Sequence, residues 1–201
     1  MNPAHSFQSS KLACQTVLFF VLMLASGFAL AATQERPDAD LRGVLEKAIG
    51  DADSFQDRFE AEVWLMDMST RLQSRVPDDH ERLELLKNIH YEAKRADLAP
   101  ELILAVINTE SNFDRWAISR VGARGLMKIM PFWLKEIPPA GDNLFDIRTN
   151  LRFGCTILKH YLKREKGDFQ RALARYNGSL GKEWYPNRVF DTLRKRWFRS
   201  R

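Results

Sequence analysis

The chain has 201 residues, with 31 Lys and Arg against 26 Asp and Glu and a formal net charge of +5. This length suits one compact domain with additional segments. A content of 45% hydrophobic and 28% charged residues excludes a disordered or collagen-like chain. Cys14 and Cys155 are the only cysteines, which excludes a disulfide scaffold and a cysteine-built zinc site. The small positive surplus is weak support for nucleic-acid binding, and we expect none.

The first 31 residues have the features of a secretory signal peptide. Lys11 precedes an apolar run over residues 17–30, which ends in a small-x-small pattern. This run is too short to cross a membrane comfortably. The alternative is an uncleaved anchor helix, which Ser26 and Gly27 near the end of the run disfavour. The sequence therefore predicts export to the periplasm or beyond, with association with the cell envelope left open.

Residues 32–84 are expected to form a polar lead-in followed by a helix. Residues 32–53 are mostly polar and typical of a loosely held segment. From there the apolar spacing is helical throughout, and no stretch alternates cleanly with period two. The first apolar stripe, which Pro77 interrupts, consists of Phe55, Phe59, Val63 and Met66.

Further helices are predicted beyond Pro77, and together they indicate an all-α domain. The expected starts are at Asp78 or Asp79, Pro100, Thr149 or Asn150, Asp168 and Pro186. Short polar side chains cap helix N-termini, and proline is tolerated in the first turn. The apolar stripes include Leu83, Leu86, Ile89 or His90, Ala93, Leu151, Cys155, Leu158 and Leu162. Connecting loops are expected at about residues 114–125, 137–148 and 177–185.

One carboxylate lies on the predicted inner face of a core helix. Residues 102–107 are apolar on every side, so this helix is expected to pass through the core. Ile103, Val106, Glu110 and Phe113 follow in steps of three, four and three on one face. Burial raises the pKa of a glutamate, which makes it a proton donor near neutral pH. The alternative is that Glu110 lies on a solvated helix end.

Two further segments have ambiguous interpretations when each is considered alone. Gly122 and Gly125 permit a tight loop before Pro131, but an ordinary connecting loop would have the same composition. Tyr176 ends an apolar stripe and precedes the turn signal Asn177-Gly178-Ser179. This tyrosine is either a plain core residue or one whose hydroxyl reaches a buried carboxylate.

Taken in order, these segments resemble the catalytic domain of the soluble lytic murein transglycosylases, which has a lysozyme-like fold. The resemblance covers residues 85–190. Its matching pieces are Glu110-Ser111, Ser119-x-x-Gly-Ala-x-Gly-Leu-Met, Asn143-Leu-Phe-Asp with Asn150 and Gly154, Tyr176-Asn177, and Tyr185. The expected organisation is a signal peptide over 1–31, a lead-in over 32–84 and a lysozyme-like transglycosylase domain over 85–201.

The resemblance implies a function and a mechanism. Glu110 would be the single catalytic carboxylate and would protonate the glycosidic oxygen between MurNAc and GlcNAc. The ionised carboxylate would then take the proton from the MurNAc 6-hydroxyl as that oxygen closes on C1. The product is a 1,6-anhydro sugar, and no water enters. Ordinary glycosidases generally need two carboxylates.

The resemblance also implies the residues that bind the substrate. Tyr176 would orient Glu110, and Asn177 would hold the glycan. Ser119, Lys128 and Met130 would line the groove around the cleaved bond. The family usually has glutamine where this chain has Lys128, and lysine donates hydrogen bonds but cannot accept them. A cation close to Glu110 also favours its charged form, so we expect an altered activity or pH optimum.

Two rival functions stay open on the sequence alone. One is a hydrolase of the same fold, which would admit water and produce reducing sugar ends. The other is a glycan-binding or assembly protein whose catalysis Lys128 has impaired, although Glu110 and Tyr176 argue against it. The sequence indicates no cofactor and no metal site, because the histidines lack ligand spacing and no phosphate loop is present. The expected partner is the peptidoglycan glycan strand; protein partners are not indicated.

Overall fold

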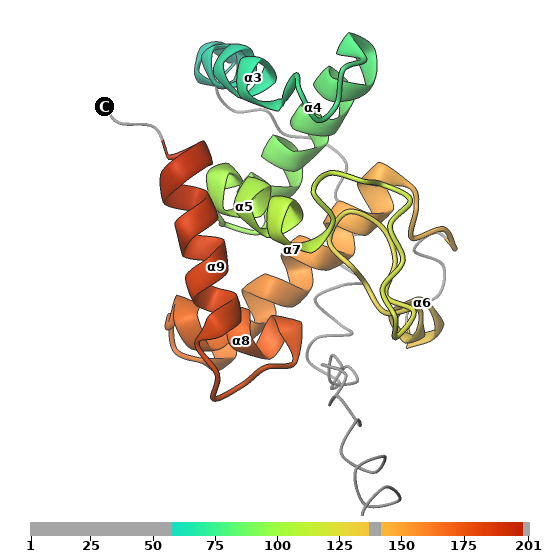
Figure 1. Ribbon diagram of the computed structural model, residues 1–201, viewed down its shortest axis with the longest axis vertical. Helices are drawn as coiled ribbons and strands as arrows, with labels where there is room; N and C mark the ends of the chain where they lie inside the picture. The colour runs from blue at the N-terminus through green and yellow to red at the C-terminus, as the bar shows by residue number, and fades with distance from the viewer. Residues whose placement is uncertain (1–57, 137–141, 199–201) are drawn as a thin grey trace, which may run out of the picture. The chain divides into compact units, whose positions relative to one another are not determined.

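The computed structural model describes residues 58–136 and 142–198, and within them the secondary structure is helical (Figure 1). Its elements are α3 (Arg58–Leu72), α4 (Asp79–Arg95), α5 (Pro100–Glu110), α6 (Phe132–Glu136), α7 (Ile147–Arg164), α8 (Phe169–Asn177), α9 (Trp184–Thr192) and the π-helix η1 (Leu193–Trp197). Extended pairing in this part of the chain is limited to isolated bridges of Arg124 with Ile118 and Ile129. The all-α prediction is confirmed. The predicted signal peptide and polar lead-in lie outside the described residues.

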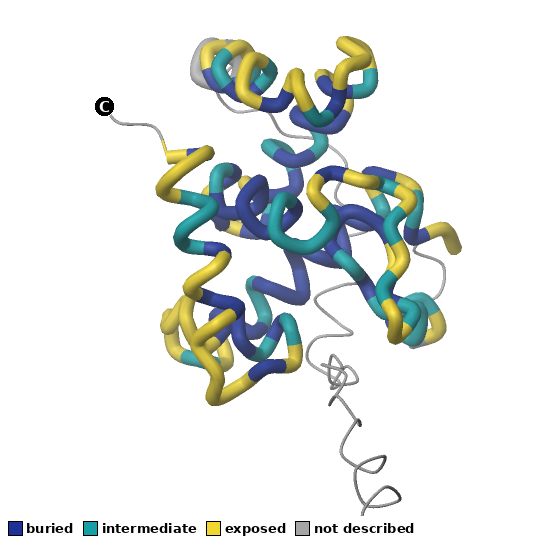
Figure 2. The backbone as a smooth tube through the Cα atoms, viewed as in Figure 1, coloured by how far each residue is buried: buried dark blue, intermediate teal, exposed yellow. Residues whose placement is uncertain are grey.

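The core is centred on α5 and α7, which are the most deeply buried helices (Figure 2). Every residue from Leu102 to Ile107 is buried, as the apolar run of α5 predicts. Helix α5 packs against α4, α9 and η1, while α7 packs against α4 and α8. Because Glu110 is the last residue of α5, the core fixes the position at which this side chain leaves the helix.

The helix starts follow the sequence signals closely. Asp78 caps α4 by accepting a hydrogen bond from the Glu81 amide at 2.7 Å, and Asp168 caps α8 in the same way. Pro100 opens α5 as predicted. Helix α7 begins earlier than expected, because Asp146 caps it by accepting from the Thr149 amide at 2.8 Å. Helix α9 also begins before Pro186, at Trp184.

The predicted buried face of α3 is wrong. Met66 is 75% exposed and Val63 is 39% exposed, whereas Trp64, Met68 and Leu72 are buried. Both sets have helical spacing, and periodicity alone does not say which one meets the core. Leu83 in α4 is likewise exposed, and its neighbour Leu85 is buried in its place.

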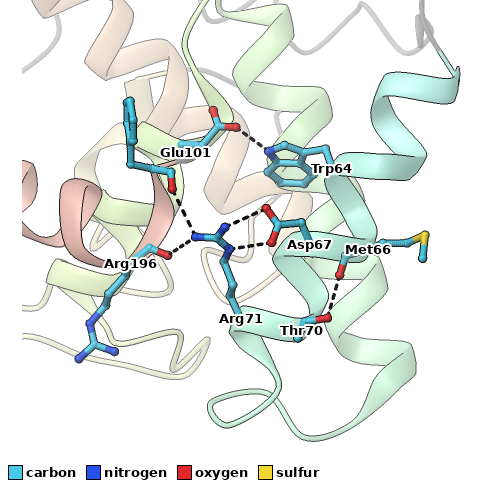
Figure 3. Close-up of polar contacts among 8 residues, drawn as sticks. Trp64, Met66, Asp67, Thr70, Arg71, Glu101 and Arg196 are labelled. Atoms are coloured by element: carbon cyan, nitrogen blue, oxygen red, sulfur yellow. Dashed lines mark hydrogen bonds and ion pairs between the residues drawn. The ribbon is translucent and has the colours of Figure 1, made fainter. Parts of the chain in front are cut away.

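Polar contacts join α3 to α5 and to the C-terminal segment (Figure 3). The Trp64 indole donates to Oε1 of Glu101 at 2.9 Å. Arg71 forms an ion pair with Asp67 and donates to the carbonyl oxygen of Arg196 at 3.1 Å. Helix α3 is therefore hydrogen-bonded to both the start of α5 and the end of η1.

A buried ion cluster joins α4 to α7. Glu92 is fully buried, and its carboxylate oxygens accept hydrogen bonds from Nε of Arg152 at 2.7 and 2.8 Å. Arg95 also donates to Glu92 at 2.7 Å and reaches Thr156. Cys155 lies beside this cluster and is buried and free. In the described part of the chain, no helix is both long and apolar enough to cross a membrane.

Candidate active site

Glu110 stands at the junction between the core helix and a strained turn. After the helix ends, Asn112 and Phe113 adopt left-handed backbone conformations with φ of 51° and 70°. Such conformations are costly for bulky residues, so surrounding contacts must hold them. Asn112 accepts hydrogen bonds from Asn108 and Arg75, each at 3.0 Å. The Phe113 ring packs edge-on against buried Trp197, with centroids 5.4 Å apart.

Two side chains from the C-terminal half hold the Glu110 carboxylate. The hydroxyl of Tyr185 in α9 donates to Oε1 of Glu110 at 2.6 Å. Asn177, the last residue of α8, forms a second side-chain hydrogen bond with the same carboxylate. Its Oδ1 atom is buried and has no hydrogen-bond partner within the described structure. A buried acceptor of this kind is normally satisfied, so a donor from a bound molecule fits here.

The environment of Glu110 raises the pKa of its carboxyl group. Burial raises the pKa of Glu110 above its usual value, while hydrogen bonds from Tyr185 and Asn177 and the charges of Lys128 and Arg188 lower it. The burial effect is the largest, so the net pKa is raised. A carboxyl group in this state can donate a proton at a higher pH than an exposed glutamate can.

The expectation that Tyr176 orients Glu110 and contacts the glycan stays a prediction, and the structure shows one hydrogen bond of its hydroxyl. Its hydroxyl donates a hydrogen bond to the carbonyl oxygen of Met127 at 2.7 Å. Only 1% of Tyr176 is exposed, so its side chain supports the loop between α5 and α6 from the protein interior. The tyrosine that binds Glu110 is Tyr185, which the sequence identified only as part of the motif set.

The loop between α5 and α6 is fastened to α7 by one buried side chain. Asn150 donates to the carbonyl oxygens of Arg124 at 2.9 Å and Leu144 at 2.8 Å, and it accepts from the Met127 amide at 2.8 Å. Gly125 has φ of 76°, and a Cβ there would lie 2.9 Å from Cγ of Asn150. The glycine is thus required both by its backbone conformation and by this close approach.

The other predicted site residues occupy the same loop. Ser119 is half-buried and accepts a hydrogen bond at its Oγ from the Ala123 amide at 3.0 Å, which closes the loop on itself. Lys128 is half-buried with φ of 53°, and its charge acts on Glu110. Met130 is half-buried and packs against the core. Arg188, which the sequence analysis missed, lies three residues after Tyr185 on α9 and also acts on Glu110.

Across residues 58–136 and 142–198, no group of three or more His, Cys, Asp or Glu side chains is arranged to hold a metal ion.

The model of the family described as "Transglycosylase SLT domain" matches residues 87–196, which is more than half of the chain. The chain therefore belongs to the SLT transglycosylase family, in agreement with the resemblance of its motifs.

Two curated relatives have similar sequences. A "Transglycosylase" of Enterobacteria phage PRD1 is 33% identical over 104 residues, which cover 48% of this chain and 38% of the relative. The "Membrane-bound lytic murein transglycosylase C" of Yersinia pestis (strain Pestoides F) is 32% identical over 118 residues, or 51% of this chain and 32% of the relative. The chain spans well under half the length of these relatives.

A solved structure of an inactive mutant of the lytic transglycosylase Slt from Pseudomonas aeruginosa aligns with 88% of this chain and 36% of that one. The TM-score is 0.42, and the sequence identity is 19%.

Proposed function

We propose that this chain is a peptidoglycan lytic transglycosylase that cleaves the β-1,4 bond between MurNAc and GlcNAc without water. Glu110 is the single general acid and base. The observation that carries this proposal is the placement of Glu110 at the end of a core helix, with its pKa raised by burial and Oε1 held by Tyr185 at 2.6 Å. Membership of the SLT family supports the same reaction class.

In the first step, protonated Glu110 donates its proton to the glycosidic oxygen. The bond between that oxygen and C1 of MurNAc breaks, and the GlcNAc side leaves as an alcohol. A raised pKa serves this step because the acid must hold its proton until the leaving oxygen needs it. Tyr185 and Asn177 then stabilise the carboxylate that forms, since both hydrogen-bond to the charged group.

In the second step, the Glu110 carboxylate takes the proton of the MurNAc 6-hydroxyl. The freed oxygen bonds to C1 and closes the 1,6-anhydro ring, while Glu110 returns to its acid form. Every proton and bond is accounted for within the substrate and one side chain. The reaction therefore requires neither a water molecule nor a second carboxylate.

The surroundings of Glu110 support a mechanism with one acid. None of the groups that shift its pKa in the described structure is another carboxylate. Asp114, one turn further on, is exposed and accepts a hydrogen bond from the Trp116 amide. Asp146 caps α7. An inverting or retaining glycosidase would instead place a second carboxyl group opposite the first.

Substrate contacts are proposed for four residues near Glu110. The buried Oδ1 of Asn177 accepts a hydrogen bond from a glycan hydroxyl or acetamido N–H, which would satisfy its missing partner. The glycan near the cleaved bond is contacted by Ser119, Lys128 and Met130. The half-buried state of all three is compatible with contact on their exposed side.

The proposal extends to the rest of the chain. Residues 1–31 are a signal peptide that directs the protein to the periplasm, residues 32–84 form the lead-in, and residues 85–201 form the catalytic domain. The substrate is the peptidoglycan strand, and the protein associates with the cell envelope through that substrate.

Mass spectrometry of the products tests this function against its rivals. Purified sacculi are digested with the protein and with Glu110→Gln, which keeps the side-chain shape but cannot transfer the proton. We expect anhydro-muropeptides from the wild type and none from the variant. Hydrated products that depend on Glu110 would indicate a lysozyme-like hydrolase. Sacculi that are bound but never cleaved would indicate a glycan-binding protein.

A further inference from the structure

Two positively charged side chains from different elements act on Glu110. Lys128 belongs to the loop between α5 and α6, and Arg188 lies on α9. The charges of both act on the Glu110 carboxylate. Lys128 is half-buried and Arg188 is exposed, so solvent and a bound molecule can reach both.

The backbone beside each of these two residues is held firmly. Met127, which precedes Lys128, accepts from the Tyr176 hydroxyl at 2.7 Å and donates to Oδ1 of Asn150 at 2.8 Å. Lys128 itself donates its amide to the Gly125 carbonyl at 3.1 Å. On α9, Tyr185 is hydrogen-bonded to Glu110, and Arg188 follows it by almost one helical turn. The backbone that carries Lys128 is therefore held by these bonds, and Arg188 is placed by the helix that carries Tyr185.

Neither cation has a carboxylate partner of its own within the described structure. Other arginines of the domain do, since Arg152 pairs with Glu92 and Arg175 with Glu165. Lys128 and Arg188 also do not assist the proposed acid. Positive charge lowers the pKa of Glu110, and it is unfavourable beside the positive charge that develops on the sugar ring. Their charge is available for an anion on the substrate.

We propose that Lys128 and Arg188 form a subsite for a carboxylate of the peptidoglycan strand, next to the bond that is cleaved. This inference rests on the proposed function and specifies its substrate class as negatively charged strands. Lysine supplies a mobile point charge, and arginine supplies a planar fork that matches a carboxylate.

The carboxylate has two chemical sources in peptidoglycan. Where the stem peptide has been removed, the lactyl group of MurNAc ends in a free carboxylate. Where the peptide is present, the lactyl group is an amide, and the negative charge lies on the peptide. Glycan strands with and without stem peptides therefore distinguish the two sources.

The experiment measures kcat/KM for release of anhydro products from four substrates. These are peptide-bearing strands, peptide-free strands, and each of the two after its carboxylates have been converted to neutral amides. For the wild type we expect a preference of about 1.5- to 5-fold for at least one charged substrate over its amidated form, the size of one charge pair near a surface.

Matched variants assign this preference to the two residues. Lys128→Gln and Arg188→Gln are each expected to reduce the ratio of charged to amidated substrate, and the double variant is expected to bring it to about one. Lys163→Gln in the last turn of α7 removes an exposed charge elsewhere and should keep the wild-type ratio. Because each ratio compares two substrates on one variant, a general loss of stability cancels.

The outcomes separate this inference from the proposed function. A charge preference on peptide-free strands assigns the lactyl carboxylate, and one confined to peptide-bearing strands assigns the stem peptide. Equal cleavage of charged and amidated strands, or an unchanged ratio in the double variant, would overturn the subsite and leave the transglycosylase intact. If no strand yields anhydro products, the proposed function fails, and the same ratios measured for strand binding then decide the subsite.

Discussion

The hydroxyl of Tyr185 donates a hydrogen bond of 2.6 Å to Oε1 of Glu110, across 75 residues of sequence. It joins α9 to the end of the core helix α5 and fixes one carboxylate oxygen. Burial and the charge of Glu110 raise the pKa of Tyr185 well above its usual value, so this tyrosine stays a neutral donor. The bond therefore orients Glu110 throughout the working pH range.

Removal of this hydrogen bond should change both the rate and the pH profile. In Tyr185→Phe the carboxylate loses a donor that stabilises its charged form, so the pKa of Glu110 rises further. The proton donor then stays protonated to higher pH, and the alkaline limb of the profile moves upward. We expect kcat to fall about 10- to 100-fold, as for loss of a hydrogen bond to a charged group. Anhydro-product release measured against pH checks this.

Tyr176→Phe is the matched control, because the Tyr176 hydroxyl donates to the carbonyl oxygen of Met127 and Tyr176 is not among the groups that shift the pKa of Glu110. It should lower stability without moving the alkaline limb. If Tyr176→Phe moved the limb and Tyr185→Phe did not, the assignment of the orienting tyrosine would be wrong.

The charge of Lys128 should set where the enzyme loses activity with rising pH. This cation lowers the pKa of Glu110, so its removal in Lys128→Gln should raise that pKa. The alkaline limb is then expected at higher pH than in the wild type, and added salt should reduce the difference. Profiles of both proteins on one neutral, amidated substrate separate this effect from carboxylate binding. If the wild type and Lys128→Gln had the same pH profile on this substrate, the effect of the Lys128 charge on Glu110 would be contradicted.

Glu110 should destabilise the fold at neutral pH. A carboxyl group whose pKa is raised by folding binds its proton more tightly in the folded state than in the unfolded state. Its contribution to the free energy of unfolding is therefore complete below the ordinary pKa of 4.5. That contribution is lost as the pH rises through the pKa of the folded state. Glu110→Gln should therefore have the higher Tm at neutral pH. Each kcal/mol of difference corresponds to about 2–4 °C. If calorimetry showed that the Tm of Glu110→Gln exceeds that of the wild type by a larger margin below pH 4.5 than at neutral pH, this prediction would be refuted.

Asn150 should be essential for holding the loop that carries Lys128. Asn150→Ala leaves the Met127 amide and the carbonyl oxygen of Leu144 without their buried partner. Each buried group left unpaired costs about 1–3 kcal/mol, so we expect a loss of at least about 2 kcal/mol in urea unfolding. The exposed Asn187→Ala serves as control and should cost about 0.5 kcal/mol or less.

Trp197 should support the turn that follows Glu110. It is fully buried, contacts Phe113, and donates to Asn108 at 3.3 Å. Trp197→Ala is expected to cost about 3–5 kcal/mol of stability and to lower kcat, because the strained turn loses its support. Phe198→Ala removes an adjacent ring that is 61% exposed and should be nearly neutral. Equal unfolding midpoints for the two variants would contradict this role.

Local chemistry made several features predictable from the sequence. Short acidic side chains and proline mark helix starts, so Asp168 and Pro100 were located correctly. The apolar run before Glu110 also has only one interpretation, because a helix that is apolar on all sides must be buried. Gly178 ends α8 in the left-handed conformation that its turn signal predicts.

The features that sequence reasoning missed depend on contacts between distant segments. Val63 and Met66 have the same helical spacing as the buried set of α3, and only packing decides between the two faces. Similarly, Tyr176 and Tyr185 are the last two pieces of the motif set, and the hydrogen bond from Tyr185 to Glu110 depends on how α8 and α9 pack. Arg188 could have been found from its position almost one helical turn after Tyr185.

In the proposed reaction, Glu110 transfers a proton between two oxygens of one substrate, and no water takes part. Digestion of sacculi in water enriched in heavy oxygen tests it directly, with mass spectrometry of the new MurNAc ends. We expect ends that are lighter than the hydrated sugar by one water and carry no heavy oxygen, and we expect Glu110→Gln to release none. Ends that carry one heavy oxygen and an intact reducing sugar would contradict it.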